Sequence, residues 1–265
     1  MPDLPVRGAG VLELDLPLPP GRMPALRAGR PLKRWRYLGV YRPDVMLCVG
    51  DAHVAGIPQR WWAVALPDGT LEQGSRGVRL DTRRARVRGV LDLELSRPYG
   101  VAVVSPHGRS YVWTLKLAPV HVRGRVSVAG REFELDGEDG FVDETAGYHA
   151  RHTAWRWSAG IGRATDGRPV AWNLVDGVHD AEAASERTVW VDGEPHEVPP
   201  QEFAPDLSRV GELDFSEWSA REARLNLLVM RNRYRQPFGE FSGRLPGGLT
   251  LDRGYGVMEE HDVHW

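Results

Sequence analysis

The sequence predicts an all-β protein built from two antiparallel β-barrels or strongly curved sheets in tandem, with little helix. Among 265 residues there are 30 glycines and 20 prolines, spread along the chain, and they interrupt every potential long helix. Short segments in which apolar and polar residues alternate lie between them. Glycine-containing dipeptides join these segments, and such dipeptides favour hairpins because a type I′ turn needs positive φ at both central positions.

Six hairpin turns follow from this pattern along the chain: Asp68-Gly69, His107-Gly108, Ala129-Gly130, Asp166-Gly167, Asp192-Gly193 and Gly247-Gly248. One segment is ambiguous. Phe215 to Met230 could hold a short helix capped by Ser216 before a strand resumes.

A weak internal repeat divides the chain. "KRWRYLGVY" around Trp35 is similar to "TAWRWSAGIG" around Trp155, and "GFVDE" from Gly140 loosely matches "GYGVMEE" from Gly254. Two similar halves are therefore expected, a domain at 1–139 and a domain at 140–265. Each half has roughly the length of an antiparallel barrel of eight to ten strands.

The arginines indicate which face of each strand points inward. Arg34 and Arg36 alternate with Trp35 and Tyr37, and unpaired arginine is rarely buried, so the aromatic face is expected to lie inside. The same rule in 231–236 turns three polar side chains inward. Buried polar groups need partners, so these three either satisfy one another or line a cavity: Asn232, Tyr234 and Gln236.

The segment from Gly147 to Asp180 is the richest in histidine, tryptophan and aspartate. A two-residue loop at Asp166-Gly167 would place Trp155, Trp157, Trp172, Leu174 and Asp176 on one face. Asp176 would then face an aromatic wall, and desolvation would raise the pKa of its carboxyl. The alternative is that Asp176-Gly177 is an exposed turn.

These patterns give a set of candidate site residues. The candidate acids are Asp176, Asp143 and Glu186, in that order. The candidate ligand contacts are His149, His152, Trp155, Trp157, Trp172, Asn232, Tyr234 and Gln236.

No metal and no cofactor are expected. On a strand, the spacing of His149 and His152 puts the two rings on opposite faces. They could share a metal only in an irregular loop completed by Asp143, Glu144 or His179. Cys48 is the only cysteine, which excludes a disulfide within the chain and a thiolate cluster. The nucleotide-binding glycine motifs are also absent.

Composition limits the partners. The formal net charge of −2 does not favour nucleic acid, which needs a concentrated basic face. No apolar run approaches about 18 residues, so no membrane span is expected. The N-terminal segment does not have the pattern of a secretory signal, and a cytoplasmic location is expected. The sequence leaves the oligomeric state open.

Five segments in order resemble a bacterial family, abundant in actinobacteria, that is catalogued as a domain of unknown function: "FVDETAGYHARHTAWRWSAGIG", "DGRPVAWNLVDG", "SERTVWVDGE", "RYRQPFGEFSG" and "GYGVMEEHDVHW". "RPYGVAVVSPHGRSYVWTLKLA" fits the same family, and the resemblance begins near Leu32. The family is similar, more distantly, to the tandem lipocalin-like superfamily of carotenoid hydratases, tocopherol cyclases and pericyclases. This resemblance implies two calycin-type barrels packed together, and it transfers no catalytic residues.

Two function classes remain. The first is an enzyme that hydrates, cyclises or isomerises a hydrophobic molecule bound in a β-barrel pocket, through a carboxylic acid kept neutral. Aromatic faces would stabilise the positive charge that develops. The second is a protein that binds a hydrophobic ligand without chemistry. A carboxyl group deep in an aromatic cavity, with no arginine partner, would favour the enzyme.

Overall fold

The structure is a computed structural model that describes residues 4–96, 100–227 and 230–264. It confirms the all-β prediction, because two large antiparallel sheets carry most of the described chain. The remaining elements are a short 3-10 helix and a two-stranded hairpin: η1 (Gly8–Glu13), β2 (Leu26–Arg27) and β3 (Arg30–Pro31). No helix among the described residues has the length and apolar character needed to cross a membrane.

The first sheet has eleven strands. They are β1 (Val6–Arg7), β4 (Lys33–Tyr41), β5 (Met46–Val54), β6 (Ile57–Ala65), β7 (Leu71–Gly74), β8 (Val78–Leu80), β9 (Arg84–Val87), β10 (Leu91–Leu95), β11 (Val101–His107), β12 (Ser110–Val128) and β13 (Arg131–Gly147). Their spatial order is β7-β6-β5-β4-β13-β12-β10-β9-β8, and β11 pairs with β12 and with β1.

The second sheet has eight strands. They are β14 (His152–Ala164), β15 (Pro169–Asp176), β16 (Thr188–Val191), β17 (Glu194–Glu197), β18 (Arg209–Val210), β19 (Glu212–Leu227), β20 (Met230–Arg244) and β21 (Thr250–His264). Their spatial order is β17-β16-β15-β14-β21-β20-β19-β18.

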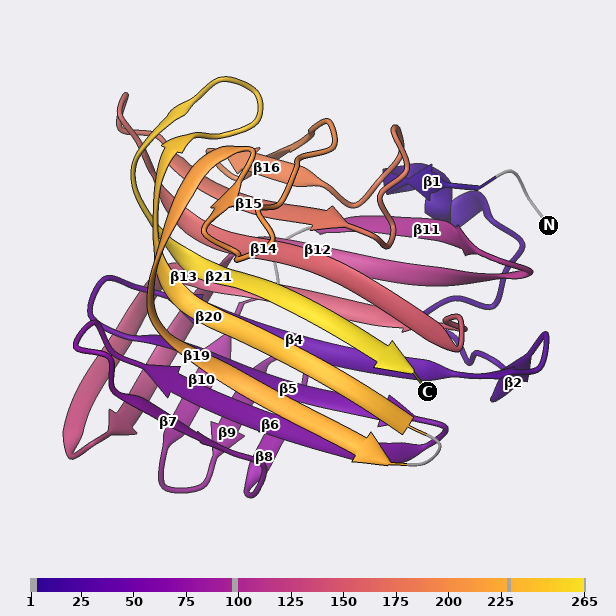
Figure 1. The fold of residues 1–265 in the computed structure, drawn as a ribbon, viewed down its shortest axis with the longest axis horizontal. Helices are drawn as coiled ribbons and strands as arrows, with labels where there is room; N and C mark the ends of the chain where they lie inside the picture. The colour runs from indigo at the N-terminus through magenta and orange to yellow at the C-terminus, as the bar shows by residue number, and fades with distance from the viewer. Residues whose placement is uncertain (1–3, 97–99, 228–229, 265) are drawn as a thin grey trace.

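The two sheets share one plan. In each, four consecutive strands form a meander, and the last strand returns to pair with the first strand of that meander: β13 with β4 and β21 with β14. Both sheets are strongly curved, and strands β19 to β21 of the second pass in front of the first (Figure 1). The first sheet ends at Gly147 and the second begins at His152. The division into domains at 139 and 140 stays a prediction.

The predicted hairpin turns lie between paired strands. Ala129 and Gly130 both have positive φ, as do Asp192 and Gly193, which is the backbone that a type I′ turn requires. The ambiguous segment that begins at Phe215 is a strand rather than a helix in its described part, because β19 continues through Leu227. Residues 228 and 229 of that segment lie outside the described residues. β19 pairs with β20 along its length, so its backbone groups form hydrogen bonds between strands instead of within a helix.

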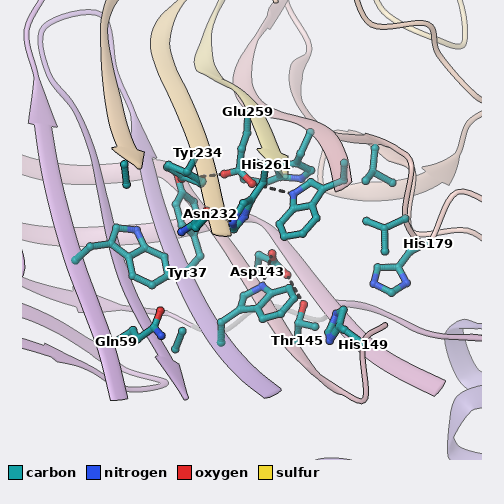
Figure 2. A pocket seen from close by; sticks show the side chains of 18 of the residues that line it. Tyr37, Gln59, Asp143, Thr145, His149, His179, Asn232, Tyr234, Glu259 and His261 are labelled. Atoms are coloured by element: carbon teal, nitrogen blue, oxygen red, sulfur yellow. Dashed lines mark hydrogen bonds between the residues drawn. The ribbon is translucent and has the colours of Figure 1, made fainter. Parts of the chain in front are cut away.

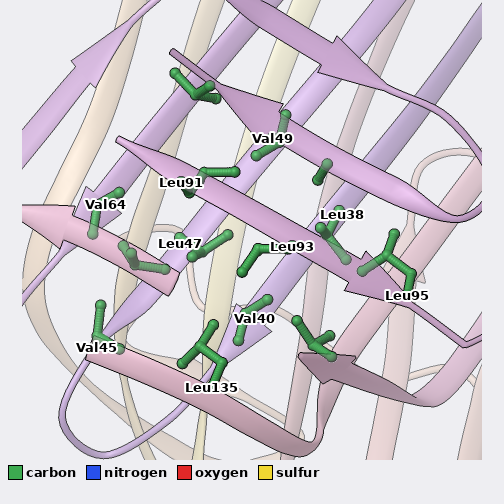
Figure 3. Packing of buried hydrophobic residues seen from close by; sticks show 14 of the residues in the cluster. Leu38, Val40, Val45, Leu47, Val49, Val64, Leu91, Leu93, Leu95 and Leu135 are labelled. Atoms are coloured by element: carbon green, nitrogen blue, oxygen red, sulfur yellow. The ribbon is translucent and has the colours of Figure 1, made fainter. Parts of the chain in front are cut away.

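Each sheet buries a separate apolar core on one face. Leu38, Val40 and Leu47 belong to the core of the first sheet, which is drawn in Figure 3. Trp172 and Leu174 belong to the core of the second. The opposite faces of the two sheets pack together through a third cluster, which contains Tyr37, the buried Cys48, Trp157 and Val257. The molecule is therefore two curled sheets joined by an aromatic interface.

The predicted register of the β14–β15 hairpin is wrong by one residue. Trp157 pairs with Val175, and Arg156 pairs with Asp176. The loop holds three residues rather than two, because the Ala164 amide donates to the Arg168 carbonyl. A one-residue slip moves every side chain of a strand to the other face. Trp172 therefore packs in the core of the second sheet, and Asp176 is exposed to solvent.

Candidate functional site

A cavity lies between the two sheets, beside their aromatic interface. The centre of a water-sized sphere can move through about 170 Å³ of this cavity. On the same measure, a cavity that holds one water molecule needs roughly 10–15 Å³. Strands of both sheets supply its walls, and Figure 2 shows side chains that point into it. The cavity is thus outside both sheet cores, whereas the sequence placed the pocket inside a barrel.

The internal repeat places one acid from each half in this cavity. In the first half, β4 and β13 pair Tyr37 with Asp143. In the second half, β14 and β21 pair Trp157 with Glu259. Asp143 and Glu259 therefore occupy equivalent positions in the two halves, and both line the cavity.

The residues beside the two acids are also equivalent. The Trp35 indole nitrogen donates to Asp143 Oδ2 at 3.3 Å, and the Trp155 indole nitrogen donates to Glu259 Oε1 at 2.9 Å. The two indole rings lie against each other, nearly parallel at 6°, with centroids 6.4 Å apart. On the opposite faces of the same strands, Arg36 pairs with Glu144 and Arg156 pairs with Glu260.

Glu259 is a buried carboxyl group whose side chain is surrounded by neutral donors. Its Oε2 atom accepts a hydrogen bond from the Tyr234 hydroxyl at 2.9 Å and another from the Gln236 amide at 3.0 Å. Burial raises the pKa of this carboxyl to about 7, although the bonds from Trp155 and Tyr234 act in the opposite direction. Glu259 can therefore hold and release a proton near neutral pH.

Asp143 has a different environment because a lysine lies beside it. Lys116 Nζ is 2.6 Å from Asp143 Oδ1 and 3.3 Å from Glu186 Oε1. Burial alone would lower the pKa of Lys116, but the two carboxylates outweigh it and leave that pKa raised. Asp143 is thus part of a buried ion cluster, whereas Glu259, at the equivalent position, is surrounded by neutral donors.

Aromatic rings form the other walls. Tyr37 and Trp157 meet edge to face with centroids 5.5 Å apart, at the inner end of the cavity. Near Glu259, the Arg221 guanidinium lies over the rings of Trp61 and Tyr234, at 5.5 Å and 4.8 Å. The charge of Arg221 slightly lowers the pKa of Glu259, but among the described residues no ion pair joins the two.

A histidine cluster borders the other side of the cavity. His149 and His179 are both buried and line it, with ring centroids 6.0 Å apart, and His107 lies next to both. Burial is the main cause of the lowered pKa of each ring, and for His179 the pKa falls to about 3. All three imidazoles are neutral at pH 7.

The structure brings together most of the candidate residues. Seven of them line the cavity: Asp143, Glu186, His149, Trp155, Trp157, Asn232 and Tyr234. Gln236 lies just behind it and donates to Glu259, and Asn232 Oδ1 accepts a hydrogen bond at 2.8 Å from His261 Nε2. The predicted inward orientation of Asn232, Tyr234 and Gln236 on β20 is therefore confirmed.

Three candidates lie elsewhere. Asp176 is exposed and Trp172 packs in the core of the second sheet, both because of the register slip. His152 is exposed and contacts Asp262 at 2.8 Å on the outside of β14. In the described ranges, one set of three side chains could hold a metal ion, and it is this exposed group of His152, Asp262 and His264.

Glu259 and Lys116 were not predicted as site residues. The internal repeat contained the signal for Glu259. In the structure Gly140 is equivalent to Gly256 rather than to Gly254, and this alignment makes Glu259 equivalent to Asp143. The two-residue offset between the sequence match and the structural match hid this relation. Lys116 is a single charged residue within the apolar part of β12, so no pattern in the sequence marked it as a site residue.

Comparison with known proteins gives a family and distant structural neighbours. Residues 62–265 match the family model described as Domain of unknown function (DUF2804). No curated protein matches the chain. Among solved structures, kievitone hydratase from Nectria haematococca is similar with a TM-score of 0.47 and 10% identity, covering 86% of this chain and 88% of that one. CghA with Sch210972 is similar with a TM-score of 0.45 and 10% identity, covering 98% of both chains.

The first of these neighbours is a hydratase by name. Because both TM-scores lie below 0.5, neither their reactions nor their ligands are transferred to this chain.

Proposed function

We propose that this chain, which belongs to the family described as Domain of unknown function (DUF2804), binds an uncharged hydrophobic molecule between its two sheets and protonates it with Glu259. One observation carries the proposal: Glu259 is a buried carboxyl in an aromatic cavity, and burial raises its pKa to about 7. A general acid works best when its pKa lies near the working pH.

The reaction is proton transfer to carbon. The electron pair of an alkene or enol bond takes the Glu259 proton and forms a C–H bond, which leaves a carboxylate and a carbocation. The indoles of Trp35 and Trp155 present faces that stabilise positive charge. Water, a second double bond or loss of a neighbouring proton then completes a hydration, a cyclisation or an isomerisation.

The groups around Glu259 suit the loss of its proton. Trp155, Tyr234 and Gln236 donate to its oxygens, so they stabilise the carboxylate that remains after the proton has left. They also fix the direction of the carboxyl group. Asp143, held by Lys116 on the same cavity, is the second carboxylate and would accept the proton that an isomerisation or hydration releases.

A non-catalytic binding protein is the alternative. Aromatic rings line much of the cavity, and a hydrophobic ligand needs no more than that to bind. The two functions differ in the role of Glu259, which is essential to the enzyme and dispensable to the binding protein.

An aryl vinyl ether such as 2-(1-methoxyvinyl)naphthalene separates the two. Its hydrolysis starts with slow proton transfer to carbon and gives a ketone that absorbs at a different wavelength. We expect the protein to accelerate this hydrolysis, and Glu259→Gln to lower the rate by about 100-fold to 10,000-fold. The rate should fall as the pH rises through about 7, because Glu259 must be protonated to act.

Glu260→Gln is the matched control. Glu260 is the next residue, but its side chain is on the opposite face of β21 from the cavity and pairs with Arg156 at 3.4 Å. This variant should keep the wild-type rate. Binding of the ether without acceleration, or equal rates for the Glu259→Gln variant and the wild type, would leave the binding protein as the function.

A further inference from the structure

The two ends of the cavity differ in how many of their buried polar atoms are unpaired. At one end, both carboxyl oxygens of Glu259 accept hydrogen bonds, and the unpaired atoms are Gln236 Oε1 and Trp61 Nε1. At the other end, neither ring nitrogen of His149 has a partner within the part of the chain that the structure describes, and the same holds for His179. Glu186 Oε2 is also without a hydrogen bond there. Buried polar atoms are normally paired, and each unpaired one costs about 1–3 kcal/mol.

These atoms belong to one place in the cavity. His149, His179 and Glu186 all line it, and each is at least nine-tenths buried, with exposed fractions of 2%, 9% and 2%. Figure 2 shows both histidines together at one side of the cavity, away from Glu259 and Tyr234. The Trp35 ring lies 5.0 Å from the His149 ring, so the aromatic wall reaches this end.

The carboxylates at this end already have a cation, because Asp143 and Glu186 share the ammonium of Lys116. Arg30 and Lys33 are close enough for their charges to lower the pKa of His149, and burial lowers the pKa of Lys33 itself to about 7. The imidazoles themselves are neutral. An uncharged polar group can pair with the two imidazoles without the cost of burying a further charge.

We propose that His149 and His179 bind a hydroxyl group, and that the ligand is an uncharged, planar, otherwise apolar alcohol or phenol. A hydroxyl both donates and accepts, as a neutral imidazole does, and its proton also suits the carboxylate oxygen of Glu186. A carbonyl could only accept, and would leave that oxygen unpaired. The nearly parallel indoles of Trp35 and Trp155 favour a flat molecule. This inference rests on the proposed function, since it names the ligand that Glu259 would protonate.

A series of naphthalenes tests the hydroxyl directly. The probes are naphthalene, 2-naphthol and 2-naphthoate, titrated into the full chain at pH 7 by calorimetry. We expect 2-naphthol to bind about tenfold more tightly than naphthalene, because two or three hydrogen bonds form with groups that are otherwise unpaired. The anionic 2-naphthoate should bind more weakly than 2-naphthol.

Substitutions show which residues cause the preference for 2-naphthol over naphthalene. His149→Phe and His179→Phe should each bind naphthalene as well as the wild type does and lose most of the preference for 2-naphthol. His179→Asn keeps a donor and an acceptor, so it should retain part of that preference. If a phenylalanine variant does not fold, His149→Leu and His179→Leu replace it. His152→Phe, at an exposed position, is the control and should change nothing.

Three outcomes would overturn the inference. These are equal binding of naphthalene and 2-naphthol by the wild type, a preference that survives in both histidine variants, or tightest binding of 2-naphthoate. Glu259→Gln should keep the 2-naphthol preference while losing ether hydrolysis, so the two proposals fail separately. If no probe binds, the inference fails, and hydrolysis of the vinyl ether decides the proposed function separately.

Discussion

The two halves of the molecule place equivalent carboxyl groups in one cavity and give them opposite electrostatic surroundings. Asp143 and Glu259 occupy the same position in matching strand pairs, and each accepts a hydrogen bond from an indole. Their neighbours on the adjoining strand differ. Lys116 on β12 contacts Asp143, and Gln236, in the equivalent place on β20, contacts Glu259.

This one difference is the basis of the roles that we propose for the two acids. The Lys116 ammonium pairs with Asp143, whereas the Gln236 amide adds no charge to offset the burial of Glu259. Under the proposed function, the repeated fold supplies the two positions, and a single side chain on the next strand makes Glu259 the acid.

Removal of Lys116 should have the largest effect on the comparison. Lys116→Met leaves Asp143 and Glu186 side by side without a cation, and breaking a buried ion pair in this way costs about 3–5 kcal/mol. We expect the free energy of unfolding to fall by that amount in urea titrations at pH 7. The loss should be smaller at acidic pH, where protonated carboxyls no longer need a cation. Gln236→Met, which removes only a neutral donor, should cost about 1 kcal/mol; equal losses would contradict the comparison.

The second prediction concerns the pH dependence of stability. Burial raises the pKa of Glu259 from 4.5 to about 7 in the folded chain. Its contribution is therefore fully present below about pH 4.5 and is lost as the pH rises through about 7. Glu259→Gln should gain about 3 kcal/mol relative to the wild type between pH 4 and pH 8.5. Other groups titrate equally in both proteins, so a constant difference across this range would show that Glu259 is not perturbed.

A charge swap tests whether the neighbouring strand sets the roles. Gln236→Lys would give Glu259 the kind of partner that Asp143 has. The pKa of Glu259 should fall by at least one unit, since a nearby opposite charge favours the carboxylate. Hydrolysis of the vinyl ether at pH 7 should then drop by about tenfold or more, with the pH edge moved to lower values. An unchanged edge would mean that Gln236 does not control Glu259.

The smallest effects concern the two indoles. Trp155→Phe removes the 2.9 Å hydrogen bond to Glu259, and Trp35→Phe removes the 3.3 Å bond to Asp143. Each change should cost about 1 kcal/mol of stability. Because the Trp155 bond lowers the pKa of Glu259, its loss should move the pH edge of the reaction upward. Trp35→Phe should leave the edge in place, and identical shifts in both variants would contradict separate roles for the two acids.

Local signals in the sequence predicted the fold and one wall of the site. Turns such as Ala129-Gly130 follow from the backbone that glycine allows, and arginine alternation identified the inward face of β20. Tyr234 and Gln236 were therefore placed correctly, and their need for partners indicated the cavity. Each of these signals depends on a few neighbouring residues.

The acid could not be found in the same way because its position depends on register between distant strands. The loop after β14 holds one residue more than a two-residue turn, and this turned Asp176 outward. The environment of Glu259 depends on Trp155 and Tyr234, which contact it but are distant in sequence. No local sequence pattern distinguishes Glu259 from Glu260. The sequence also could not show that the cavity lies between the sheets, since a central strand such as β5 presents apolar side chains on both faces.

The return of β21 to β14 has a consequence for how the protein folds. Trp155 and Glu259 are 104 residues apart, and at 5–20 residues per second the ribosome needs roughly 5–20 s to synthesise that interval. During that time one edge of β14 has no partner strand, and such edges are prone to pair with other chains. Ladders between distant segments also form slowly. The first sheet has the same delay, since Trp35 on β4 and Asp143 on β13 are 108 residues apart. Both sheets should therefore need protection by chaperones during synthesis.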